Sequence, residues 1–222
     1  MEMRWTLWMA SGAAACLALA GCSSPDGART EVKKESPPAR AANEQAPDIY
    51  RVNLDTSKGK VIIEVHRDWS PHGADHLYSL VKLGYYDGNR FYRVVRNFVV
   101  QWGINGDPAT TDLWSNGYIP DDPVKQPNVK GTVTFAATST RNSRATQLFI
   151  NLKDNRSLDR DRFAPVGKVV SGMDVVDRFY DAYGEMAPNG KGPDPRELMR
   201  LGNQYLIDNF ARLDRIDKAT IE

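Results

Sequence analysis

The sequence is poor in cysteine, which limits the ways in which the protein can be stabilised. Its 222 residues include only two cysteines, Cys16 and Cys22. Cys16 lies inside an apolar N-terminal segment that is typical of a removable secretory signal, so the mature chain keeps a single cysteine and no intrachain disulfide can form. We therefore expect a fold that depends on packing even in an oxidising compartment.

The chain also lacks an excess of either charge and a long apolar run. It carries 29 Lys and Arg residues against 28 Asp and Glu residues, a formal net charge of +1 at pH 7, and no basic stripe. We therefore expect no nucleic-acid partner. The apolar segment after Arg4 is short and rich in small side chains, which favours a secretory signal over a membrane span.

Histidine is scarce as well, and no metal site is evident. His72 and His76 are two of three histidines and lie four residues apart on a predicted helix, but no third ligand follows at matching spacing. Acidic residues of the segment 103–128 lack the alternating spacing of a calcium loop. We interpret the two histidines and these aspartates as solvated, and we expect neither a metal nor another cofactor; the aspartates are Asp107, Asp112, Asp121 and Asp122.

The N-terminus resembles the signal and lipobox of bacterial lipoproteins. Leu19, Ala20 and Gly21 precede Cys22, as in that motif. The resemblance implies a signal peptide at residues 1–21, cleavage before Cys22, and lipid on its thiol and new amino group. Ser23 occupies a position where aspartate often retains lipoproteins in the inner membrane. We thus expect a cell-envelope protein, lipid-anchored in the outer membrane and facing the periplasm, with the inner membrane, the cell surface and an unlipidated secreted form as alternatives.

The rest of the chain divides into a tether and one domain. Residues 22–47 contain four prolines, mixed charges and almost no large apolar residue, so we predict a lipidated, disordered tether. Residues 48–222 are long enough for one well-buried domain and show no repeat or second linker. We expect this domain to be a monomer.

Short strands dominate the predicted domain. The runs 49–56 and 60–66 flank Ser57-Lys58-Gly59 and indicate a hairpin. Ser70 and Pro71 fit the N-cap and first position of a helix that Gly84 can end. The segment 103–128 shows no sustained periodicity and is interpreted as a functional loop. Further strands are predicted at 131–138, 147–152, 163–170 (with Pro165 at an edge or bulge) and 213–221, and further helices after Gly172 and over 196–210.

The segment 91–103, FYRVVRNFVVQWG, carries the clearest functional signal. Side chains alternate along a strand, so Arg93, Val99 and Gln101 share one face if the turn at 96–97 preserves the phase. Tyr92 and Trp102 then point the other way, and we interpret them as packing in the core or on the flank of the barrel, with substrate contact as the alternative. An arginine and an amide beside apolar surface suit a peptide substrate, although the segment alone also fits an ordinary half-exposed strand.

Four segments in order, FYRVVRNFVVQWG, GTVTFA, TQLFIN and LDRDRFAPVGKVVSGMDVVD, resemble the cyclophilins, a family of peptidyl-prolyl cis/trans isomerases. The resemblance covers residues 48–222. It implies a mainly β fold, a closed eight-stranded antiparallel barrel capped by two helices, to which this chain adds the predicted C-terminal helix. It also implies a groove on the outside of the barrel that acts on proline-containing polypeptides.

The resemblance also implies the site residues. Arg93 corresponds to the catalytic arginine and Gln101 to its amide partner. Phe149 corresponds to the ring that floors the proline pocket. Phe98, Val99 and Phe135 would hold the proline ring, and the stretch 135–137 would pair with the substrate backbone. The implied substrate-binding residues are together Phe98, Val99, Phe135, Ala136, Ala137, Gln147, Phe149 and Phe163.

The chain departs from the family at the opposite wall of the groove. Ser157 stands where many eukaryotic members carry tryptophan, which removes a reason to expect tight cyclosporin binding. The segment after Leu158-Asp159 is one residue longer than in those members, and Phe163 or Arg162 occupies the region where they carry a histidine. A second hypothesis also stays open: the groove could bind proline-containing segments as a holdase or assembly module, with isomerisation incidental.

Overall fold

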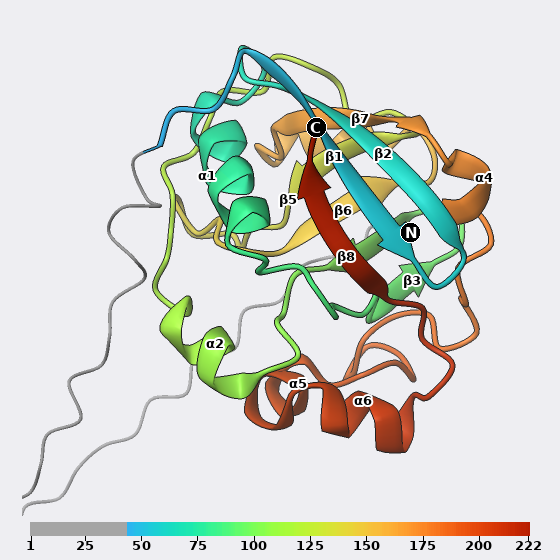
Figure 1. The fold of residues 1–222 in the computed structure, drawn as a ribbon. Helices are drawn as coiled ribbons and strands as arrows, with labels where there is room; N and C mark the ends of the chain where they lie inside the picture. The colour runs from blue at the N-terminus through green and yellow to red at the C-terminus, as the bar shows by residue number, and fades with distance from the viewer. Residues whose placement is uncertain (1–43) are drawn as a thin grey trace, which may run out of the picture. The chain divides into compact units, whose positions relative to one another are not determined.

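A computed structural model describes residues 44–222. The expected signal peptide, Cys22 and most of the tether lie outside the described residues. The described part contains eight strands: β1 Ile49–Thr56, β2 Gly59–His66, β3 Arg93–Val95, β4 Val99–Trp102, β5 Thr132–Phe135, β6 Leu148–Asn151, β7 Pro165–Ser171 and β8 Ile216–Ile221. They form one sheet in the order β3-β4-β6-β5-β7-β2-β1-β8, and every neighbouring pair is antiparallel (Figure 1).

The β1–β2 hairpin is confirmed. Thr56 pairs with Gly59 across a two-residue turn, and the register continues to Ile49 opposite His66. Buried residues alternate with exposed or partly buried residues along both strands, because only the inner face packs against the core. Pro165 also lies where predicted, since the β5–β7 register shifts at its pairing with Thr134.

Strands β4, β5 and β6 differ from the hairpin because all of their residues are buried. Their inner side chains belong to the main core, which includes Val100, Val133 and Ile150. On the outer side, Val99 of β4 and Phe149 of β6 belong to a second apolar cluster. Burial on both faces therefore marks a region where the outside of the sheet carries a packed apolar cluster.

The expected closed barrel is wrong: the eight strands form an open half-barrel. Edge strands β3 and β8 share no ladder, and the nearest connection is an isolated bridge between Arg90 and Arg215. The reason is that β3 is only three residues long and its neighbour at Val94 is Gly184, from the segment after α4 (Met173–Val176). That segment therefore occupies part of the edge that barrel closure would need.

The helices also differ from the expectation of two caps and one C-terminal helix. Helix α1, Pro71–Lys82, was predicted, but α4 is a single turn, and α2, Pro108–Leu113, lies in the segment expected to be an irregular loop. The C-terminal helix is split into α5, Pro195–Leu201, and α6, Asn203–Asn209 (Figure 1). The break falls at Gly202, whose φ of 64° and ψ of −150° are not helical, and only glycine fits there because a Cβ would lie 2.1 Å from the Gly106 carbonyl oxygen. The remaining helix is α3, Ser157–Arg160.

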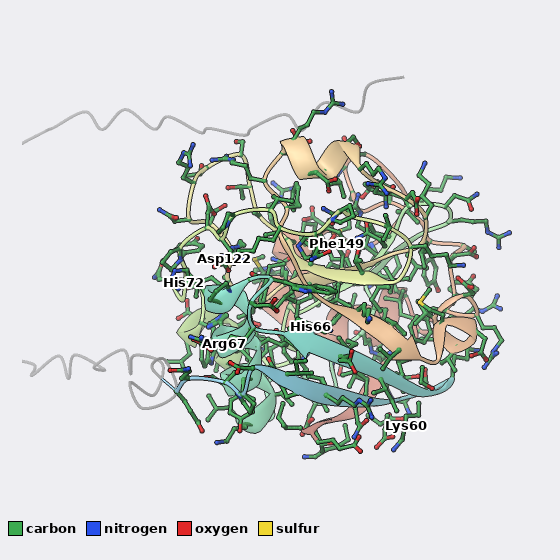
Figure 2. The ribbon with its side chains drawn as sticks, turned by 90° about the horizontal axis from the view of Figure 1, so that it is seen from above. Lys60, His66, Arg67, His72, Asp122 and Phe149 are labelled. Carbon is green, nitrogen blue, oxygen red and sulfur yellow. The ribbon has the colours of Figure 1, made fainter. Side chains whose placement is uncertain are left out.

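A buried ion pair closes the N-terminus of α1. Ser70 was expected to cap the helix with its side-chain hydroxyl, but that hydroxyl makes no capping hydrogen bond. Instead, Asp122 accepts hydrogen bonds from the Ser70 hydroxyl at 2.5 Å and from the Gly73 N–H at 2.9 Å. Figure 2 shows Asp122 beside His72 at this end of the helix. Arg144 pairs with Asp122 at 2.9 Å, and both side chains are 2% exposed. The interpretation of Asp122 as solvated was therefore wrong.

Ordered contacts begin before the expected domain start at residue 48. Ala46 is buried, and its N–H donates to Asp75 at 2.9 Å. Glu44 pairs with Lys82 at the end of α1 at 2.6 Å. The last residues assigned to the tether thus pack against α1.

Residues 44–222 include no helix that is both long and apolar enough to cross a bilayer.

The interpretation of His76 as solvated was also wrong, and its burial predicts a pH effect. Its ring lies beside Trp114 and Phe135, and its Nε2 is shielded from solvent without a hydrogen-bond partner. Burial lowers the pKa of His76 to about 4, and nearby Arg144 adds to the shift, although a hydrogen bond with the Ala145 backbone opposes it. The folded protein therefore holds His76 neutral.

We expect the free energy of unfolding to fall as the pH drops from about 6.5 to about 4, because the unfolded chain takes up the His76 proton first. The slope is at most about 1.4 kcal/mol per pH unit. In denaturant titrations at a series of pH values, the unfolding free energy of His76→Gln should lack the pH dependence that His76 causes. The control His72→Gln, which replaces an exposed histidine on the same helix, should keep it. Equal slopes in the wild type and His76→Gln would contradict the prediction.

Candidate active site

Arg93, Gln101 and Phe149 form a row across three neighbouring strands on the outer face of the sheet. Arg93 on β3 lies opposite Gln101 on β4, which lies opposite Phe149 on β6. Directly paired residues of antiparallel strands point to the same face, so the three side chains are neighbours. The turn does preserve the phase, and Asn97 allows this by adopting φ 57°. The expected common face of Arg93, Val99 and Gln101 is confirmed.

A directional hydrogen-bond chain fixes the polar part of the row. Arg93 Nη1 donates to Gln101 Oε1 at 2.9 Å, and Gln101 Nε2 donates to Gln147 Oε1 at 3.1 Å. The Tyr92 hydroxyl donates to the same Gln147 oxygen at 2.7 Å. Burial raises the pKa of Tyr92 well above its ordinary value, so this hydroxyl stays protonated and keeps donating. The Gln147 amide is thereby held with its oxygen towards the network.

An apolar surface lies beside this network. Phe149 and Phe163 meet edge to face with ring centroids 5.7 Å apart. The Phe98 ring lies 5.4 Å from the Arg93 guanidinium carbon, so it links the apolar surface to the charge. We call this surface the outer cluster; it consists of Val99, Phe149, Leu158 and Phe163, bordered by Phe98, Ala136 and Ala137.

Phe135 does not belong to this site, contrary to the expectation that it holds the substrate ring. Its side chain is fully buried in the main core and faces His76. The reason is the alternation of β5, because Thr134 is the residue that pairs with Phe149 on the outer face. Ala136 follows the strand, and its N–H donates to the Gln147 carbonyl oxygen at 2.9 Å. Ala136 and Ala137 border the outer cluster, and their pairing with the substrate backbone stays a prediction.

The opposite wall is made by α3 and the residues after it. Ser157 begins α3 and is exposed, while Leu158 and Phe163 are buried in the outer cluster. Arg162 adopts φ 67° and donates to the Ser139 carbonyl oxygen at 3.2 Å. Phe163 follows this turn and contributes an aromatic ring to the wall.

Three residues of the site were not selected from the sequence. Leu158 stands in a family motif and could have been included. Tyr92 was predicted to pack in the core, which is confirmed, but no pattern indicated that its hydroxyl reaches Gln147. Glu185, whose carboxylate contacts Arg93 at 2.6 Å, lies 92 positions away and had no local signal.

No three His, Cys, Asp or Glu side chains between residues 44 and 222 are grouped so that they could hold a metal ion. What the site offers is a fixed cation and two amides beside an apolar surface. Such a site can hold an apolar ring while donating hydrogen bonds to an adjoining peptide group.

Comparisons with known proteins agree with this geometry. A Cryptosporidium parvum cyclophilin type peptidyl-prolyl cis-trans isomerase, crystallised in the presence of the dipeptide Ala-Pro, superposes with a TM-score of 0.58 at 17% identity, covering 78% of this chain and 98% of that chain. The fold is therefore cyclophilin-like. The family model for cyclophilin type peptidyl-prolyl cis-trans isomerase/CLD matches residues 51–196.

Bacterial relatives are more similar in sequence. A peptidyl-prolyl cis-trans isomerase of Acinetobacter baylyi is 34% identical over 141 residues, 58% of this chain and 70% of the relative. A probable peptidyl-prolyl cis-trans isomerase of Brucella abortus is 34% identical over 160 residues, 67% of this chain and 80% of the relative. The chain belongs to the cyclophilin-type peptidyl-prolyl cis-trans isomerase family, and its activity is the isomerisation of peptidyl-prolyl bonds.

Proposed function

We propose that the row of Arg93, Gln101 and Phe149 is the catalytic groove, and that it acts as a monomer on proline-containing segments of envelope proteins during their folding. Rotation about a peptide bond meets a barrier of about 18–20 kcal/mol because resonance gives the C–N bond partial double-bond character. X-Pro bonds therefore interconvert over roughly tens to hundreds of seconds. Acceleration requires only that the protein favour the twisted amide.

Arg93 is suited to this task. In the twisted amide the prolyl nitrogen becomes pyramidal and regains a lone pair, which a guanidinium N–H can bind more strongly than in either planar form. An interaction that exists only in the transition state raises the turnover number. Gln101, together with backbone near Ala137, would hold the carbonyl that rotates or its neighbour.

The outer cluster is suited to holding the proline ring. Phe149 provides a floor, Phe98 and Val99 one side, and Phe163 with Leu158 the other. A ring fixed in this pocket would leave the preceding carbonyl as the part that turns. The Gln147 amide, oriented by Tyr92, adds a polar contact at the edge of the pocket.

The observation that carries the proposal is the register that places Arg93, Gln101 and Phe149 on one face. The test is an isomerisation assay with proline tetrapeptides that differ in the residue before proline. Purified protein should accelerate the reaction well above its uncatalysed rate. A folded protein that binds these peptides without accelerating them would support the holdase hypothesis instead.

We also propose that lipid on Cys22 anchors the chain in the cell envelope, in the outer membrane facing the periplasm. The proposal is supported by the lipobox residues Leu19 to Cys22 and by Ser23. The proline-rich segment 22–47 would then hold the groove away from the bilayer.

In a bacterial host, Cys22→Ser should abolish incorporation of labelled palmitate and move the protein from the detergent-extracted membrane fraction to the soluble fraction. Cys16→Ser is the matched control, because Cys16 lies in the discarded signal, and it should behave like the wild type. Retention of Cys22→Ser in the membrane fraction would contradict lipid anchoring at this residue.

A further inference from the structure

Glu185 contacts the proposed catalytic arginine from the side opposite to Gln101. Arg93 Nη2 donates to Glu185 Oε2 at 2.6 Å, while Nη1 donates to Gln101 at 2.9 Å. The Arg93 side chain is 7% exposed and that of Glu185 is 23% exposed. A short, charge-assisted hydrogen bond at the largely desolvated edge of a groove is stronger than a surface ion pair.

The backbone around Glu185 is attached to the strand that carries Arg93. Gly184 forms a β-bridge with Val94, the residue next to Arg93 on β3. The other carboxylate oxygen of Glu185 accepts a hydrogen bond from the Met186 N–H at 2.9 Å. One oxygen is therefore held by the local backbone while the other binds the guanidinium.

Two glycines make this arrangement possible. The Gly192 N–H donates to the Glu185 carbonyl oxygen at 2.8 Å. A Cβ on Gly190 would lie 2.3 Å from that oxygen, and one on Gly192 would lie 2.8 Å from it. The segment therefore folds tightly on the Glu185 backbone, and any side chain at Gly190 would displace it.

The two acceptors together restrict the guanidinium. An arginine bound through one Nη alone can still turn about its terminal bonds, whereas acceptors on both Nη atoms fix the plane of the group. One acceptor lies on β4 and the other on a segment bridged to β3, so both belong to the frame that carries Arg93. These two acceptors therefore fix the orientation of the Arg93 guanidinium before the substrate binds.

We propose that Glu185 is a positioning residue that holds the Arg93 guanidinium in the orientation required by the twisted prolyl amide. The inference rests on the proposed role of Arg93 and extends it to a residue outside the sequence motifs. Glu185 acts through Arg93 and does not contact the reacting atoms.

The test measures kcat and KM separately for Glu185→Gln and Glu185→Ala in the full chain, purified in detergent, with one proline tetrapeptide. We expect kcat to fall about tenfold in Glu185→Gln and further in Glu185→Ala, because glutamine still offers a neutral acceptor. KM should stay within about twofold, since orientation matters most in the transition state. Unchanged or increased kcat in Glu185→Gln would overturn the inference.

Asp181→Asn is the matched control. Asp181 pairs with Arg96 at 2.7 Å and ties the same segment to the same hairpin, but Arg96 is 78% exposed and lies at the β3–β4 turn. We expect its kcat and KM to stay within about twofold of the wild type. A loss as large as that of Glu185→Gln would indicate a purely structural role of the segment and would overturn the inference.

A double-mutant cycle separates the inference from the proposed function. If Glu185 acts through Arg93, then Glu185→Gln should cause no further loss in an Arg93→Ala background. The same tenfold loss in that background would overturn the inference. An inactive wild type would instead overturn the proposed function, and an active wild type with an active Glu185→Gln variant would overturn the inference alone.

Discussion

Arg93→Ala is expected to lower kcat/KM for a proline tetrapeptide by about 100- to 1000-fold, the usual effect of removing one preorganised donor from a transition state. The fold should survive, because the Glu185 carboxylate is partly exposed and water can replace the lost hydrogen bond. The measurement is the isomerisation rate at several enzyme concentrations, together with the unfolding midpoint of the variant.

Arg96→Ala is the control for this prediction. Arg96 lies in the same hairpin three residues after Arg93, is 78% exposed and pairs with Asp181. Its loss should change kcat/KM by less than about twofold, since exposed ion pairs contribute little. A kcat/KM of Arg93→Ala close to the wild-type value would contradict the catalytic role of Arg93. Near-normal binding of proline-containing segments by the variant is what a proline-binding module predicts, because binding would depend mainly on the outer cluster.

Arg144→Met is expected to have the largest effect on stability. Its guanidinium pairs with Asp122 while both side chains are 2% exposed. Burial alone would raise the pKa of Asp122, but the Ser70 hydroxyl, the Gly73 N–H and Arg144 together hold it below its usual value, so the carboxyl group is ionised. Removal of Arg144 leaves a buried charge uncompensated, at a cost of about 3–5 kcal/mol.

Denaturant and thermal unfolding measure this loss, which corresponds to a melting temperature lower by on the order of 10 °C. Arg178→Met, which removes an exposed ion pair with Asp174, should cost less than about 0.5 kcal/mol. Adding Asp122→Asn to Arg144→Met should recover part of the loss, because the uncompensated charge is then gone. An unchanged midpoint in Arg144→Met would contradict the importance of the pair.

The parts of the fold that could be predicted are those that depend on residues close together in the sequence. The β1–β2 hairpin, the helix starting at Pro71 and the bulge at Pro165 depend on neighbouring residues, and all three are present. Closure of the sheet depends on contacts between distant segments. The bridge between Val94 and Gly184 takes part of the β3 edge, and no pattern within either segment indicates it.

Burial of polar residues also depends on distant segments and could not be predicted from the sequence. No local pattern indicated that His76 and Asp122 are buried, and both were interpreted as solvated. In the structure Asp122 is buried because Arg144 and the N-terminus of α1 satisfy its charge, and His76 is covered by Trp114. Burial of a polar group requires partners, and these partners come from segments far apart in the chain.

The sequence by itself determined that Arg93 and Gln101 share one face of a hairpin, because strand alternation is local. Its four ordered motifs indicated the family. Tertiary structure alone decided that Phe135 faces the core, that the half-barrel stays open and that Glu185 binds Arg93. The physical reason is that a period-two pattern specifies which residues share a face, whereas the packing of distant segments decides which face is the core and which residue completes a charge pair.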